Sequence, residues 1–124
     1  MNSIELQERL KMFAYRIVPL CEALPPKNVA KVIESQQLRS AFSSAANYRT
    51  VYKGQSSRSI TSKLSIAFEK IDESLICLEV ISDLTLLKEG LLKDVVKEAD
   101  ELARILAASK EKRTNKKYLF FNFK

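Results

Sequence analysis

Scarcity of glycine and proline is the feature that most limits the folds open to this chain. The 124 residues include only two glycines and three prolines. Because these residue types mark most turns, their scarcity favours a few long helices over many short strands. The natural breaks fall at Pro25-Pro26, at Gly54 and shortly after Asp83. The sequence therefore predicts four long helical segments.

Each segment repeats apolar residues at spacings of three and four, which is typical of an amphipathic helix. Asn2 with Glu5 predicts a cap on the first helix, and Ser56 or Ser57 is available to cap the third. Pro19 lies inside the first pattern and predicts a kink there. The predicted helices span residues 3–24, 28–53, 57–83 and 87–112.

Long helices joined by short loops predict an all-α, antiparallel up-down-up-down four-helix bundle over residues 1–112, followed by a basic and aromatic tail over 113–124. A second apolar row on the third helix, Ile66, Cys77 and Val80, suggests contact with another protomer, although a fourth helix could also cover it. The stripes expected to form the core are Leu6, Leu10, Phe13, Ile17, Cys21, Val32, Ile33, Leu38, Ala41, Phe42, Ala45, Tyr48, Ile60, Leu64, Ala67, Phe68, Ile71, Leu75, Leu78, Ile81, Leu91, Val95, Ala99, Leu102, Leu106 and Ser109.

Several classes of function lack their residues in this sequence. Histidine is absent, which removes the commonest general base and metal ligand, and the two isolated glycines form no phosphate-binding loop. Cys21 and Cys77 lie on separate predicted helices, so we expect free thiols, and two cysteines supply too few ligands for a zinc site. We therefore expect no catalytic residue, no metal, no cofactor and no enzymatic activity.

The sequence also bears on the compartment. No run approaches the roughly 18 uncharged residues that a membrane-spanning helix needs, so no membrane association is expected. The first residues carry acids, Glu5 and Glu8, where a signal peptide would have a basic region followed by an apolar one. We expect a cytoplasmic protein.

Polar residues interrupt the second and third predicted helices on faces that otherwise look buried. Arg39 lies 15 residues before the turn at position 54 and Glu69 lies 15 after it, so an antiparallel hairpin places them at similar height. We expect Arg39 to pair with Glu69 or Glu73, and Ser43 and Asn47 to satisfy polar groups on a facing helix. Such a network would set helix register or a protomer interface. Paired carboxylates could also act as acid and base or hold a metal, but dimetal bundles use histidine.

The net charge of +6 is unevenly distributed along the chain. Residues 27–70 carry eight basic and two acidic side chains, whereas residues 71–112 carry six basic and ten acidic ones. Residues 113–124 add four basic side chains and no acid. The cations expected near the turn between the second and third helices are Arg49, Lys53, Arg58 and Lys63.

Such a cationic patch has two interpretations. Lysine and arginine are the main contacts to a phosphate backbone, so the patch predicts binding of RNA or DNA with little sequence specificity. In a closed ring, copies of the patch would repeat around one end and their fields would add. The alternative is a solvated basic face that keeps the protein soluble.

The last residues place four aromatic side chains behind a basic spacer: Tyr118, Phe120, Phe121 and Phe123. An exposed segment of this kind is an aggregation hazard. We therefore expect it to dock, either in a groove of the protein's own oligomer or on a partner protein. Aromatic residues beside cations could also stack on single-stranded bases.

Two stretches, SQQLRSAFSSAANYR (35–49) and KLSIAFEKIDESLICLE (63–79), carry a specific resemblance. They are similar to the four-helix-bundle family first noticed in proteins encoded by intervening sequences of large-subunit ribosomal RNA genes, whose members are often labelled ribosomal-protein-like. The similarity covers about residues 13–112. It is densest at Gln37, Leu38, Arg39, Ser40, Ala46, Asn47, Tyr48, Arg49, Lys63, Leu64, Glu73 and Glu79.

The resemblance implies an antiparallel four-helix protomer that assembles into a ring-like homopentamer. It also implies kinship with the accessory protein of diversity-generating retroelements, a basic bundle that binds nucleic acid beside a reverse transcriptase. No enzymatic activity is established for the family. Two hypotheses follow: a non-enzymatic oligomer that binds nucleic acid through the basic patch, or a protein–protein adaptor that uses the ring and the aromatic tail.

Overall fold

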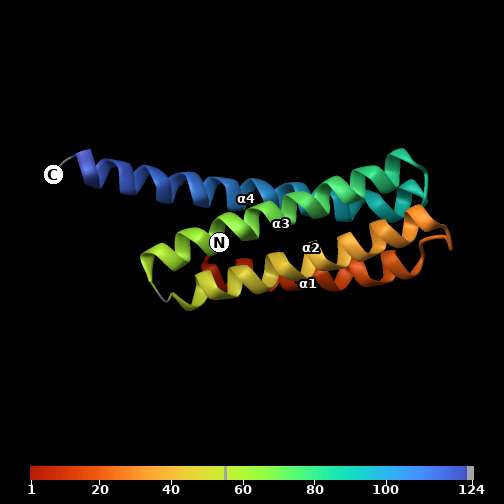
Figure 1. Cartoon of the computed structure of the whole chain (residues 1–124), viewed down its shortest axis with the longest axis horizontal. Coiled ribbons are helices and arrows are strands. Elements are labelled where there is room, and N and C mark those ends of the chain that lie inside the picture. The colour runs from red at the N-terminus through yellow and green to blue at the C-terminus, as the bar shows by residue number, and fades with distance from the viewer. Residues whose placement is uncertain (55, 123–124) are drawn as a thin grey trace.

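The computed structural model describes residues 1–54 and 56–122, with side chains as far as Thr114. In this part of the chain, four α-helices run alternately up and down (Figure 1). Their bounds are α1 Ser3–Glu22, α2 Asn28–Lys53, α3 Ser57–Asp83 and α4 Glu89–Asn122. The prediction of an all-α, antiparallel four-helix bundle is confirmed, and α2 and α3 have the predicted bounds.

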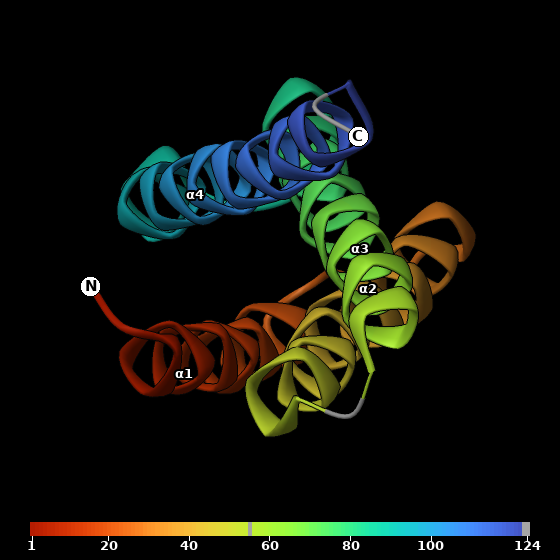
Figure 2. The ribbon, with the colours of Figure 1, turned by 90° about the vertical axis from the view of Figure 1, so that its left-hand side faces the viewer.

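Each helix packs against its neighbours in the sequence, and α2 and α3 share the most extensive contact. Viewed from one end, α1 lies beside α2 and α4 lies beside α3 (Figure 2). Of the four helix pairs that pack together, α1 and α4 have the least backbone contact, and an arginine links them. Nη2 of Arg9 lies 2.6 Å from Oε1 of Glu98 and 3.2 Å from Oε1 of Glu101. These hydrogen-bonded carboxylates raise the pKa of the Arg9 guanidinium.

Most of the predicted apolar stripes are buried or half-buried, and they form one core along the bundle. Three predicted core residues were wrong, because Val32, Phe42 and Leu91 are exposed. Each has an apolar neighbour in the chain, and adjacent helical positions point about 100° apart, so only one of each pair can face the core. Leu92 takes the inner place beside Leu91, as the buried residues Ile33 and Ala41 do in the other two pairs.

Capping side chains begin two of the helices as predicted. The backbone N–H of Glu5 donates to Oδ1 of Asn2 at 2.9 Å, and Ser59 N–H donates to Oγ of Ser56 at 3.1 Å. α2 ends at Gly54, whose φ of 63° lies in the left-handed region that glycine adopts without strain. α1 continues through Pro19 and ends at Glu22, two residues before the predicted end.

The end of α4 differs from the prediction. The helix continues to Asn122 instead of stopping near Lys112. No glycine or proline follows Gly90, so the sequence offers nothing that breaks the helix after Lys112. Figure 1 shows the last turns of α4 passing beyond the turn that joins α2 and α3. The predicted division into a bundle over 1–112 and a tail over 113–124 is therefore not marked by a helix end.

The second apolar row of α3 is half-buried within the single chain. Val80 packs against the core, so α3's neighbours cover part of this row. Among the described helices, none is both long and apolar enough to cross a membrane.

Candidate nucleic-acid interface

A polar seam crosses the interface between α2 and α3, formed by Gln37 and Ser40 on one helix and Glu73 and Ser74 on the other. The hydroxyl of Ser74 donates to Oε1 of Gln37 at 3.1 Å, and the hydroxyl of Ser40 donates to Oε2 of Glu73 at 3.1 Å. Gln37 and both serines are almost fully buried. Each hydrogen bond joins the two helices across their interface.

The predicted ion pair of Arg39 with Glu69 or Glu73 was wrong. Arg39 and Glu69 are exposed, and neither forms an ion pair within the described residues. Glu73 is bound by Ser40 and by Lys70, whose Nζ lies 3.3 Å from Oε2. Because successive helical residues point about 100° apart, placing Ser40 against α3 turns Arg39 toward solvent.

Ser43 and Asn47 also differ from the prediction, because they bond to each other along α2. Nδ2 of Asn47 donates to the backbone carbonyl of Ser43 at 2.8 Å and to its Oγ at 3.1 Å. The seam is therefore smaller than the predicted network. It instead contains Gln37, Ser40 and Ser74, which the sequence analysis did not assign to it.

The four predicted cations lie around the α2–α3 turn, the end of the bundle called here the basic end. Arg49 and Lys53 are one helical turn apart on α2, and both are exposed. Arg58 is exposed in the first turn of α3, whereas Lys63 is half-buried. Five residues separate Arg58 from Lys63, which places them about 140° apart around the helix. Arg49, Lys53 and Arg58 are thus the accessible members of the group.

Carboxylates are absent from this part of the hairpin. From Ser35 to Phe68 the sequence holds five basic residues and no aspartate or glutamate. None of Arg49, Lys53, Arg58 and Lys63 forms an ion pair among the described residues. No carboxylate of the hairpin therefore neutralises these cations, and the charges of Arg49, Lys53 and Arg58 act outward into solvent.

The structure adds α4 to the basic end, which the sequence analysis did not foresee. A shallow hollow of about 320 Å³ there is lined by α4 residues Lys112 and Arg113 together with residues of the other three helices. Nε of Arg113 donates to Oγ1 of Thr61 at 2.7 Å, and its Nη2 donates to Oγ of Ser57 at 2.8 Å. Arg113 thus fastens α4 to the start of α3, and Lys112 remains exposed as a further cation. The antiparallel topology could have indicated this, since α4 must return to the α2–α3 turn.

The aromatic residues predicted to dock lie outside the described side chains. Tyr118, Phe120 and Phe121 belong to the last turns of α4, for which the structure gives the backbone, and Phe123 lies outside the described residues.

Both thiols are free, as expected, with Cys21 buried and Cys77 half-buried. Burial raises the pKa of Cys21 to about 11 and also raises the pKa of Cys77. Nearby carboxylates, Glu34 for Cys21 and Glu73 for Cys77, add to both shifts. In the described residues, no group of three or more carboxylates or thiols is placed to hold a metal ion.

Comparison with known proteins finds a similar fold among the solved structures. The sequence matches no protein-family model and no curated protein. A solved structure, a protein of unknown function from the S23 ribosomal protein family of Bacteroides thetaiotaomicron, aligns with a TM-score of 0.79 and 25% identity. The alignment covers 90% of this chain and 99% of that chain. The two proteins share a fold. The ribosomal-protein-like resemblance seen in the sequence therefore has structural support.

Proposed function

We propose that the protein is a non-enzymatic, cytoplasmic nucleic-acid-binding protein that contacts the phosphate backbone through its basic end. The observation that carries the proposal is the run from Ser35 to Phe68, which has five basic residues and no acid and folds back on itself at this end. Arg49, Lys53 and Arg58 are exposed there and form no ion pair among the described residues. Phosphate groups are the natural counterpart of such cations.

Low sequence specificity is part of the proposal. Contacts from flexible cations to phosphates fix position and carry no direct sequence information. The resemblance to a family linked with ribosomal RNA intervening sequences and with a retroelement accessory protein supports RNA and DNA as the ligands to test. The solved neighbour, from a ribosomal protein family, has no known function and leaves that choice open.

We further propose that the chain forms a homo-oligomer, with the pentamer as the number that the resemblance implies. The described surface of α1 and α2 exposes Met12, Tyr15 and Phe42, which are large apolar side chains. The rings of Tyr15 and Phe42 lie 6.4 Å apart, so they form one patch across two helices. Covering this patch with another protomer would remove apolar area from water.

The binding proposal is tested by removing charge at one end and comparing the loss with an equal removal at the other. The variant R49Q/K53Q/R58Q takes three exposed cations from the basic end. The matched control K88Q/K93Q/K97Q takes three exposed lysines: Lys88 lies just before α4, and Lys93 and Lys97 lie in its first turns. With labelled single-stranded RNA or DNA in fluorescence anisotropy, we expect the first variant to bind on the order of 100-fold more weakly at about 0.1 M salt. Equal affinity of the two variants would contradict the proposal.

A protein–protein adaptor is the second candidate, favoured by the exposed patch of Met12, Tyr15 and Phe42 and by the apolar composition of residues 118–123. The two candidates differ in what accompanies the purified protein. A raised ratio of absorbance at 260 nm to that at 280 nm, abolished by nuclease, supports nucleic-acid binding. An ordinary ratio with a copurifying protein supports the adaptor.

A further inference from the structure

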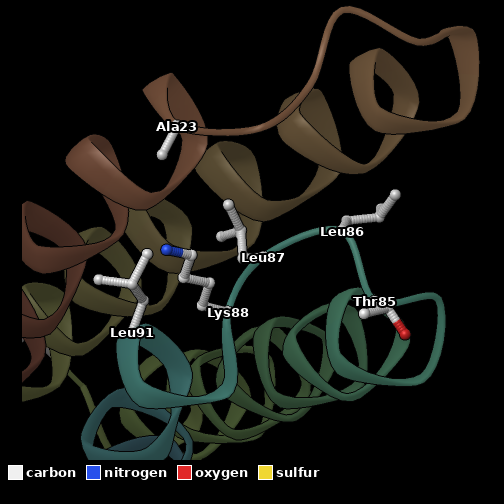
Figure 3. Close-up of a pocket in the computed structure, with 6 residues that line it drawn as sticks. All are labelled: Ala23, Thr85, Leu86, Leu87, Lys88 and Leu91. Atoms are coloured by element: carbon white, nitrogen blue, oxygen red, sulfur yellow. The ribbon is translucent and has the colours of Figure 1, made fainter.

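The end of the bundle opposite the basic end carries an apolar hollow. This loop end consists of the α1–α2 and α3–α4 connections, and its hollow measures about 550 Å³. Figure 3 shows Ala23, at the end of α1, facing Leu87, Lys88 and Leu91 across it. Leu91 is 51% exposed, so the hollow leaves a large apolar side chain in contact with water. An apolar segment that packed against Leu91 would remove this surface from water.

The rim of the loop end is acidic. A groove between α3 and α4 is lined by Glu79, Asp83 and Glu89 together with Lys93, and Glu89 directly follows the segment 85–88 that lines the hollow. Residues 79–94 carry four acidic and two basic side chains. An occupant of the hollow would therefore gain from carrying positive charge beside its apolar part.

The C-terminal segment of this chain has that composition. Residues 112–124 hold five basic side chains and no acid, and five of the six residues 118–123 are apolar. The segment continues α4 as a helix to Asn122, beyond the α2–α3 turn (Figure 1). A segment so rich in aromatic residues needs cover from water.

A chain cannot place this segment in its own hollow. Leu91 lines the hollow near the start of α4, and α4 continues as one helix to Asn122 at the other end. The 31 residues between them span about 46 Å at 1.5 Å per residue. Only a second copy can bring its C-terminal segment to the hollow.

We propose that residues 116–123 of one copy dock in the loop-end hollow of a second copy, with Lys116 and Lys117 beside the acidic rim and the aromatic residues against Leu87 and Leu91. The contact joins two different surfaces and is head-to-tail. One copy then keeps a free hollow and the other keeps a free segment, so the contact extends until it closes. It is independent of the nucleic-acid proposal, because none of Arg49, Lys53 and Arg58 takes part.

Site-specific disulfide trapping of the full chain tests the contact directly. A chain carrying Lys88→Cys is mixed with a differently tagged chain carrying Asn122→Cys, and the mixture is oxidised mildly. We expect a covalent dimer that contains both tags. The matched control replaces Lys88→Cys with Val29→Cys, an exposed position in the first turn of α2 that does not line the hollow. No mixed dimer, or equal yields from the two positions, would overturn the proposal.

Sedimentation over a concentration series supplies a second readout that needs no cysteine. Leu91→Gln is compared with Val29→Gln, since the two side chains are 51% and 46% exposed and each lies in the first turn of its helix. We expect Leu91→Gln to weaken association about fivefold and Val29→Gln to leave it unchanged. The double substitution Phe120→Ser and Phe121→Ser, on the other partner in the contact, should weaken it at least as much. Equal masses for wild type and all three variants would contradict the proposal.

Discussion

The two ends of this bundle differ in charge, in exposed apolar surface and in how their helices are connected. At the basic end, Gly54 ends α2 in the left-handed region, and exposed cations surround the turn. At the loop end, Thr85 adopts a φ of 54° after α3, and the connection lines an apolar hollow with an acidic rim. One core built of the same kind of helices thus supports two surfaces of opposite chemistry. The surfaces come from exposed residues that the packing leaves free to vary.

The middle of the bundle separates the two ends and offers the largest stability test. Within the described residues, the Gln37 amide has one hydrogen-bond partner, Ser74, which donates to its Oε1, and its Nε2 is buried without a partner. Ser74→Ala should lower the free energy of unfolding by about 2 kcal/mol, because it leaves the buried Gln37 amide without a hydrogen-bond partner. Adding Gln37→Met should restore most of the loss. Urea denaturation measures both.

Nucleic-acid affinity of the folded Ser74→Ala variant is the accompanying control. It should equal that of wild type, since the seam lies away from the basic end. If Ser74→Ala lowered both the free energy of unfolding and the nucleic-acid affinity, the basic end would depend on the seam in the middle of the bundle.

Two substitutions at left-handed residues should move stability in opposite directions at the two ends. Gly54→Ala should cost about 1 kcal/mol, because a Cβ strains a backbone at φ 63° even though nothing lies within 4 Å of it. Thr85→Gly should gain about 1 kcal/mol by relieving the same strain. Thermal denaturation measures both changes in stability. If both substitutions stabilised the protein, or both destabilised it, the predicted difference between the two ends would be contradicted.

The smallest expected effect concerns Cys21, which lies close to the loop end. Its pKa of about 11 exceeds the ordinary 9.0 because burial favours the neutral thiol. This contribution to stability is fully present below pH 9 and is lost as the pH rises toward 11. We expect Cys21→Ala to reduce the decline in unfolding free energy between pH 9 and 11. An unchanged decline would contradict the assignment.

Thiol alkylation gives a kinetic counterpart at constant pH. Near pH 8 both thiols are protonated, so iodoacetamide should react slowly with the native protein. Half-buried Cys77 should react before buried Cys21. Faster labelling of Cys21 would indicate that the loop end opens readily.

Helix positions and caps were predictable because they depend on local periodicity and on residues such as Asn2 and Ser56. The direction of a single side chain was not, as Arg39 and Ser40 demonstrate. Both lie level with Glu73, but a rotation of about 100° decides which one meets it. For the same reason, the sequence could not decide which of Leu91 and Leu92 is exposed and which is buried.

The cations at the basic end were predictable as a group, because charge clusters in the sequence near one turn. Lys112 joins these cations because α4 returns to the same end of the bundle, and this proximity depends on how the helices pack. The exposure of Arg49 and Arg58 against the half-burial of Lys63 depends on how α2 and α3 pack. These features required the structure.

Salt dependence of nucleic-acid affinity tests the central claim most directly. The logarithm of the association constant for duplex DNA is plotted against the logarithm of salt concentration for wild type, R49Q/K53Q/R58Q and K88Q/K93Q/K97Q. Each lost phosphate contact reduces the slope by about 0.9, so the first variant should lose about 2.7 from it, whereas the second keeps the wild-type slope. A wild-type slope in the first variant, or equal losses in both, would contradict binding at the basic end.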